Sequence, residues 1–130
     1  MRNTLACLAC VGAVISAGWA LIPPATASNA NSILIGRSGR HNAYLISLRF
    51  ANGRKVQAIP AGTYTFVIYD YSRIHNFALG SQTENKRLFT TGIRWIGTKR
   101  YTLTLTPGNY AYACSAHFQT MNGTFVVTGS

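Results

Sequence analysis

Acidic side chains are scarce in this 130-residue chain, which has only Asp70 and Glu84 against twelve Lys and Arg residues. The formal net charge at pH 7 is therefore +10. A Cys-His hydrolase needs a third group that orients its base, and neither acid lies in a matching motif, which argues against that class. A strongly positive surface instead attracts anionic partners: nucleic acid, an anionic lipid surface or an acidic protein.

The basic residues do not form the cluster that a nucleic-acid module would show. Apart from Arg2, they are dispersed along the sequence, at Arg37, Arg40, Arg49, Arg54, Lys55, Arg73, Lys86, Arg87, Arg94, Lys99 and Arg100. They also lack the aromatic pattern of such modules. We therefore expect no nucleic-acid partner and favour a protein with an acidic surface, with a membrane surface as the alternative.

Long apolar runs are absent except near the N-terminus, where one extends from Leu5 to Leu21 and is followed by Ala25-Thr-Ala27. This pattern predicts an export signal over residues 1–27, and a retained membrane anchor is the alternative. We expect a periplasmic or extracellular protein with a flexible lead at residues 28–41 and one folded domain at residues 42–130.

Cysteine is also rare. Cys7 and Cys10 lie inside the apolar run and would leave with the signal, so Cys114 would be the sole thiol of the exported chain. An unpaired thiol outside the cytoplasm is exposed to oxidation or to pairing between chains. Binding a metal is one way to protect it.

No segment after residue 28 shows the sustained 3.6-residue apolar period of a helix. Residues 64–69 and 101–106 instead alternate with a period of two, most clearly where Tyr101, Leu103 and Leu105 alternate with threonines. Turn sequences such as Asn52-Gly53 and Pro107-Gly108 recur at short intervals. The sequence therefore predicts an all-β fold, a Greek-key sandwich of two antiparallel sheets with seven or eight short strands.

Four residues offer donors that favour copper. Cys114, His117 and Met121 lie within eight residues of one another, and His75 follows an earlier predicted strand. A thiolate and a thioether select copper over harder metals, and two imidazoles, one Cys and a distant Met define an electron-transfer copper site. Because Cys114 ends one predicted strand and His75 follows another, both can meet at one end of a sandwich.

The chain also resembles the cupredoxins, most closely the small exported plastocyanin, amicyanin and halocyanin types. The resemblance covers residues 42–128 and is carried by four segments. These are Gly62–Asp70, His75-Asn76-Phe77, Thr102–Tyr110 and Cys114–Val127, which contains a Met-x-Gly-Thr-Phe sequence. It implies a Greek-key β-sandwich that transfers single electrons through one type 1 copper ion, and it implies an electron carrier rather than an enzyme.

Carried over to this sequence, the resemblance makes His75, Cys114 and His117 the strong ligands and Met121 the weak axial ligand. Asn76 would tie the first ligand loop to the Cys loop, where Ser115 lies. Phe118 and Ala116 would frame His117 where a redox partner docks. The loop departs from the family in one respect, because three residues separate His117 from Met121 instead of two or four. That difference would change the axial contact.

The same residues are also compatible with other functions. A copper storage or delivery protein would use the same ligands but exchange the metal readily, and it is the main alternative. An oxidase or nitrite reductase would need a second copper site, for which His41 is the sole spare imidazole. Taken singly, Cys114 would be a small buried apolar residue and Met121 a core gap-filler. We expect the protein to be a monomer.

Overall fold

The structure is a computed structural model that describes residues 32–129. The predicted signal at residues 1–27, with Cys7 and Cys10, lies outside the described residues. Within residues 32–129, no helix has the length and apolar character needed to cross a membrane.

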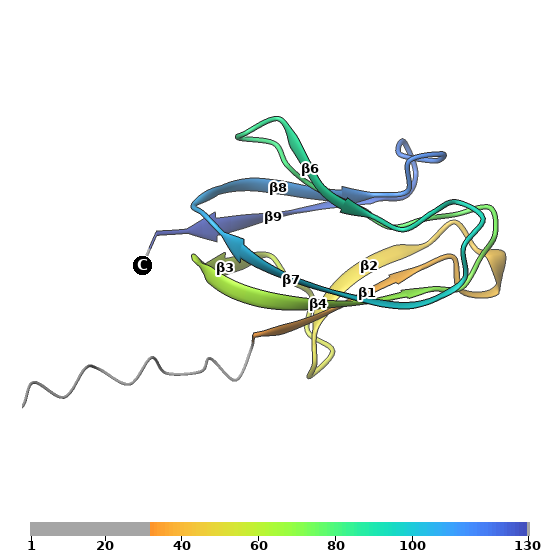
Figure 1. Cartoon of the computed structure of the whole chain (residues 1–130), viewed down its shortest axis with the longest axis horizontal. Helices are drawn as coiled ribbons and strands as arrows, with labels where there is room; N and C mark the ends of the chain where they lie inside the picture. Colours follow the sequence, from red (N-terminus) through yellow and green to blue (C-terminus); the bar gives the residue numbers. More distant parts are fainter. Residues whose placement is uncertain (1–31, 130) are drawn as a thin grey trace, which may run out of the picture.

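Two β-sheets pack face to face, as Figure 1 shows. The first sheet has the strand order β2-β1-β4-β7, and the second has the order β3-β9-β8-β5-β6. The strands are β1 Ile33–Ser38, β2 Ile46–Phe50, β3 Ala58–Pro60, β4 Gly62–Asp70, β5 Ala78–Ser81, β6 Lys86–Thr90, β7 Gly97–Leu105, β8 Gly108–Ala113 and β9 Asn122–Thr128. A single 3-10 turn, η1 at Arg40–Asn42, completes the regular structure in the described part of the chain. The predicted all-β sandwich is confirmed.

The prediction of purely antiparallel sheets was wrong, because each sheet contains one parallel pair. Strand β1 runs parallel to β4 in the first sheet, and β3 runs parallel to β9 in the second. The remaining pairs are antiparallel. Alternation in a sequence shows which side chains face the core, but it carries no information about the direction of the neighbouring strand.

The predicted flexible lead at residues 28–41 differs from the structure over residues 33–38, which form β1 between β2 and β4. The core-facing residues of β1 are Leu34, Gly36 and Ser38, all buried. Two of these three are small or polar, so the apolar alternation that identifies a strand is hidden. A Cβ atom at Gly36 would lie 2.5 Å from Ile68 Cδ1, so a larger residue there would displace core side chains.

The core between the sheets is rich in stacked aromatic rings. Phe77 stacks on Tyr112 with ring centroids 5.5 Å apart, and Phe89 stacks on Tyr101 at 4.0 Å. Phe77 is fully buried and directly follows His75-Asn76. The burial of such a large ring stabilises the fold and fixes the end of the loop that carries His75.

Candidate metal centre

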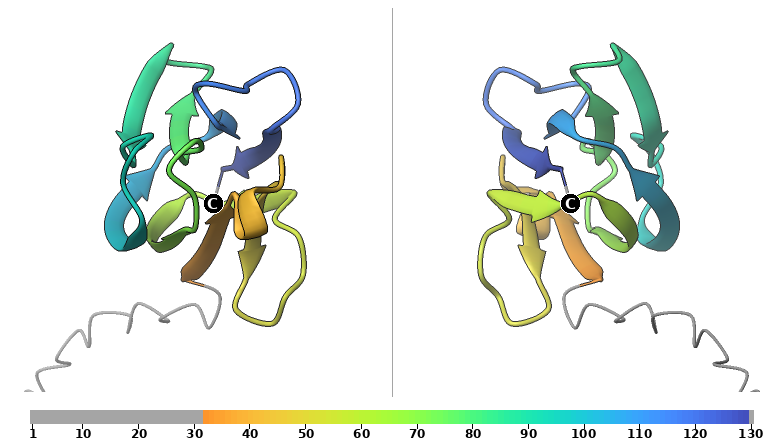
Figure 2. Two further views of the ribbon diagram at one scale, coloured as in Figure 1. Left: turned by 90° about the vertical axis from the view of Figure 1, so that its right-hand side faces the viewer. Right: turned by 90° about the vertical axis from the view of Figure 1, so that its left-hand side faces the viewer.

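Four loops meet at one end of the sandwich, here called the ligand end. They comprise residues 39–45, 71–77, 91–96 and 114–121. This end lies on the right in Figure 1 and faces the viewer in the left view of Figure 2. The loop 71–77 leaves β4 in the first sheet and enters β5 in the second, so it crosses between the two layers.

Three predicted ligands form a compact triangle at the ligand end. The Cys114 Sγ atom lies 3.8 Å from His75 Nδ1 and 3.6 Å from His117 Nδ1, and the two Nδ1 atoms are 3.1 Å apart. Cys114 and His75 are fully buried, whereas His117 is partly exposed. Among the described residues, this is the one cluster of three His, Cys or acidic side chains with the proximity that a metal ion requires.

Met121 lies at the other end of the same loop and is fully buried. Its carbonyl accepts a hydrogen bond from the Cys114 N–H at 2.9 Å, and its own N–H donates to the His117 carbonyl at 2.8 Å. The three residues between His117 and Met121 therefore form one closed turn of backbone. This turn absorbs the unusual spacing and holds Met121 beside both ligands on its loop.

No protein-family model and no curated protein sequence matches the chain. The chain is, however, similar to solved structures. Rusticyanin from Thiobacillus ferrooxidans is similar with a TM-score of 0.56 and 17% identity, over 74% of this chain and 76% of rusticyanin. Auracyanin A, a "blue" copper protein from Chloroflexus aurantiacus, is similar with a TM-score of 0.51 and 18% identity, over 74% of this chain and 98% of auracyanin.

The chain has the cupredoxin fold. Within this fold, the triangle of donor atoms has the size that a metal ion would need. Donor atoms that share one metal ion, with bonds of about 2.0 Å to nitrogen and about 2.3 Å to sulfur, lie roughly 3 to 4 Å from one another. The three measured separations lie in that range. The donors themselves, one thiol and two imidazoles with a buried thioether nearby, are those of a type 1 copper site.

The loop at residues 39–45 contacts His75 and orients its ring. The His75 Nε2 atom faces the Asn42 carbonyl at 3.4 Å, which would hold the proton on Nε2 and leave Nδ1 free for a metal. Gly39 makes the close approach possible: its φ is +68°, and a Cβ there would lie 2.8 Å from His75 Cδ2. The Tyr44 ring lies edge-on to both imidazoles, with centroids 4.9 Å from His75 and 4.8 Å from His117.

Asn76 joins the His75 loop to the Cys114 loop. Its Oδ1 atom accepts a hydrogen bond from the Ser115 N–H at 2.7 Å, and its Nδ2 atom lies 3.1 Å from Ser115 Oγ. The same Nδ2 atom lies 3.2 Å from the Thr91 carbonyl, and the Asn76 carbonyl accepts from Ser38 Oγ at 2.9 Å. The bridge predicted between the two ligand loops is thus present, and it extends to two further segments.

Thr91 connects this bridge to a buried carboxyl group. Its Oγ1 atom donates to Asp70 Oδ2 at 2.6 Å and accepts from the Phe77 N–H at 2.8 Å. Asp70 is only 1% exposed, and burial raises the pKa of its carboxyl group above the ordinary value. Hydrogen bonds from Thr91 and Ser72 oppose that shift.

The solvent side of His117 opens into a hollow of about 450 Å³. Tyr44, Ala116, Phe118 and two polar residues line it with His117. Phe118 is 62% exposed. The two residues predicted to frame His117 therefore lie at the surface beside it.

The sequence predicts the four candidate donor residues but gives no sign of three further residues that support them. Asn42 acts through its backbone carbonyl, which no residue pattern reveals. Tyr44 comes from the loop at residues 39–45, whose path depends on positive φ angles at Gly39, His41 and Asn42. Thr91 carried no signal beyond a polar residue after a short strand. His41, the spare imidazole, is exposed in the same loop.

Proposed function

We propose that the protein is a type 1 copper electron carrier. The observation that carries this proposal is the compact triangle of Cys114 Sγ, His75 Nδ1 and His117 Nδ1, with sides of 3.1 to 3.8 Å. When bound, copper supplies a one-electron Cu(I)/Cu(II) couple. His75, Cys114 and His117 would be the strong ligands, and Met121 would be a weak ligand.

The surrounding residues hold the donor atoms in fixed positions. Asn76 couples the two ligand loops, the Asn42 carbonyl orients the His75 ring, and the closed turn from His117 to Met121 ties the Cys114 loop to itself. Ligands that are held from outside change position little between oxidation states, so the cost of reorganisation is small. The same rigidity favours electron transfer over metal storage, which requires the ligands to open.

Electrons would leave through His117, because it is the one partly exposed member of the triangle. The hollow around it, with Phe118 and Ala116 at its rim, would receive the redox partner. Replacing Phe118 by Asp should slow electron transfer to the physiological partner and leave the visible spectrum unchanged. If the spectrum disappeared as well, Phe118 would support the ligands instead of framing the docking site.

The proposed setting is outside the cytoplasm, either periplasmic or extracellular, with the protein acting as a monomer. The export-signal pattern at residues 1–27 supports this location. A net charge of +10 supports a redox partner with an acidic surface, because opposite charges accelerate encounter.

An anaerobic redox titration of the copper-loaded protein tests the carrier function. The proposal predicts reversible uptake of one electron per copper ion, with the metal retained through repeated cycles. Loss of copper during reduction, or rapid transfer of copper to a chelator, would instead indicate storage or delivery.

A further inference from the structure

A second hollow lies beside the ligand end, on the first sheet. Its volume is about 280 Å³, and three arginines line it together with Leu45. We call the group of Arg37, Arg40, Arg49 and Leu45 the arginine hollow. The remaining lining residues are Ser38, Ile46 and Ser47.

Strand register brings two of these arginines to the same face of the sheet. Arg37 is paired with Ser47, and Arg49 is paired with Ile35, so the arginines are diagonal neighbours on an antiparallel pair. Arg40 follows in the turn η1, directly after β1. Three like charges around one hollow repel one another, and an anion placed among them would relieve that repulsion.

No acid of this chain is available to neutralise the three arginines. The chain has two acidic residues, and Asp70 is buried in its bond to Thr91. Glu84 lies in the turn between β5 and β6, where its carboxylate accepts a hydrogen bond from Thr106 at 3.2 Å. The charge of the arginine hollow is therefore left for an external ligand.

Two of the guanidinium groups are already held in place. Arg37 lies over the Tyr69 ring at 5.5 Å, and Arg49 Nη1 donates to the Gly53 carbonyl at 2.9 Å. A guanidinium has five N–H donors, so both groups keep free donors for a carboxylate. Groups that are held in advance lose less entropy on binding, which favours a specific contact over diffuse attraction.

The arginine hollow and the hollow beside His117 are lined by adjacent residues of one loop. Leu45 lines the arginine hollow, and its neighbour Tyr44 lines the hollow beside His117. Both side chains are more than half exposed, at 69% and 56%. A partner that places a group in the arginine hollow would therefore cover Tyr44 and approach His117.

We propose that the arginine hollow binds a carboxylate-rich segment on the surface of the redox partner and so orients that partner over His117. This inference rests on the proposed electron-carrier function and identifies the docking chemistry for it. Paired carboxylates match the planar donors of arginine. Contacts with three separate guanidinium groups would also set the partner's orientation.

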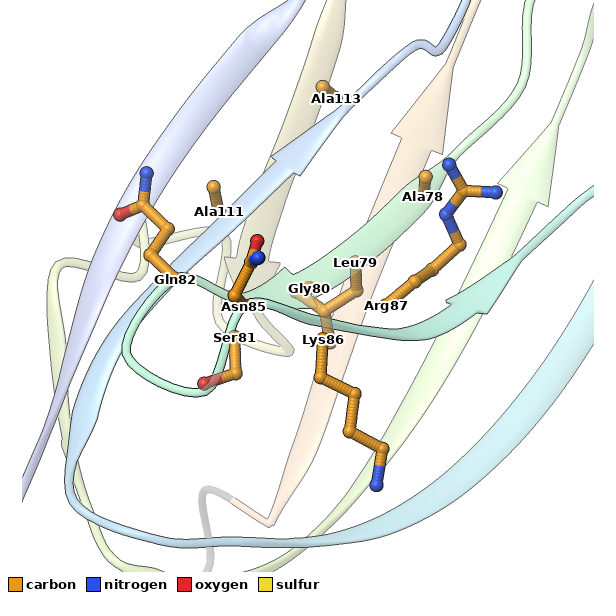
Figure 3. A pocket seen from close by; sticks show the side chains of 10 residues that line it. All are labelled: Ala78, Leu79, Gly80, Ser81, Gln82, Asn85, Lys86, Arg87, Ala111 and Ala113. Atoms are coloured by element: carbon orange, nitrogen blue, oxygen red, sulfur yellow. The ribbon is translucent and has the colours of Figure 1, made fainter.

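A third hollow provides a matched control. It has a volume of about 260 Å³ and contains two basic residues, Lys86 and Arg87, above a floor of small residues. Figure 3 shows their side chains extending in different directions from β6. Lys86 is paired with Ser81, at the end of β5 that is remote from Cys114. Changing this pair removes the same charge as changing two arginines, but away from the proposed docking site.

The test measures the affinity of the copper(I) protein for a hexaglutamate peptide by calorimetry at low ionic strength. The double variant Arg37→Gln/Arg40→Gln is compared with Lys86→Gln/Arg87→Gln. We expect the arginine variant to bind about tenfold more weakly and the control to change by less than about twofold. Arg40→Gln alone, in an exposed turn, should weaken binding about threefold without affecting the strands.

Equal weakening in the two double variants would overturn the proposal, because the peptide would then respond only to net charge. Displacement of the peptide by an equal concentration of inorganic phosphate would also overturn it, since the hollow would then be a site for small oxyanions. The blue absorption of each oxidised variant is recorded in parallel. If the wild-type protein lacked this absorption, the carrier function would fail, whereas the affinity comparison tests the arginine hollow separately.

Discussion

Buried polar side chains gather at the ligand end of the sandwich, whereas the opposite end is closed mainly by apolar packing. Six of the seven buried polar or charged residues among the described residues lie at or near the ligand end, and Ser81 is the exception. The six are Ser38, Asp70, Ser72, His75, Asn76 and Thr91. At the opposite end, Tyr64 and Tyr110 donate their hydroxyl groups to the backbone carbonyls of Pro60 and Thr106.

The comparison shows that this fold buries polar side chains mainly at the ligand end. A buried polar group destabilises a protein unless it is hydrogen-bonded. Within residues 32–129, every buried side-chain nitrogen and oxygen has a partner, so the network at the ligand end is complete. The opposite end supports the fold alone, while the ligand end also orients side chains for chemistry.

Breaking the network at its centre should have the largest effect on stability. Asn76→Ala removes the bridge between the ligand loops, because the Ser115 N–H loses its acceptor and the Thr91 carbonyl loses the Asn76 Nδ2 donor. We expect the free energy of unfolding to fall by about 3 kcal/mol, since buried groups lose their partners. Chemical denaturation measures the loss, and the visible spectrum of the copper-loaded variant should change as the two loops separate.

A matched change at the opposite end should have a smaller and purely structural effect. Tyr110→Phe removes one hydroxyl that donates to the Thr106 carbonyl at 2.9 Å. The expected loss is about 1 kcal/mol, with an unchanged copper spectrum. An altered spectrum in this variant, or an unaltered one in Asn76→Ala, would contradict the division of roles between the two ends.

Asp70, which belongs to the network at the ligand end, should make the stability of the protein depend on pH. The expected effect is smaller than those of the two substitutions above. Burial raises the pKa of Asp70 in the folded protein above its unfolded value near 3.8. The folded state therefore binds more protons between these two pKa values, and stability falls as the pH rises through that window. The difference in unfolding free energy, Asp70→Asn minus wild type, should increase from pH 3 to pH 7. A constant or decreasing difference in denaturation experiments on the copper-free proteins would contradict this.

The parts of the fold that the sequence predicts are those with a clean contrast between faces. In β7, Leu103 and Leu105 alternate with threonines, and this strand was predicted. In β1, the inward positions include Gly36 and Ser38, and the strand was missed. Gly36 is small because Ile68 and Phe77 occupy the space in front of it, a constraint that only the assembled sandwich reveals.

The candidate metal centre likewise has a part that the sequence predicts and a part that it does not. The spacing of Cys114, His117 and Met121 is local, so the sequence was sufficient to suggest these ligands. The contact from the Asn42 carbonyl to His75 joins segments 33 residues apart and uses no side chain of Asn42. Backbone contacts of this kind follow from the path of a loop and have no residue type that predicts them.

The visible absorption spectrum of the copper(II)-loaded protein, compared with that of Cys114→Ser, tests the central claim most directly. Direct bonding of the Cys114 thiolate to copper predicts an intense blue band that a mild reductant bleaches reversibly and that the serine variant lacks. A wild-type protein that binds copper without this band, or a serine variant that keeps it, would contradict the type 1 copper site.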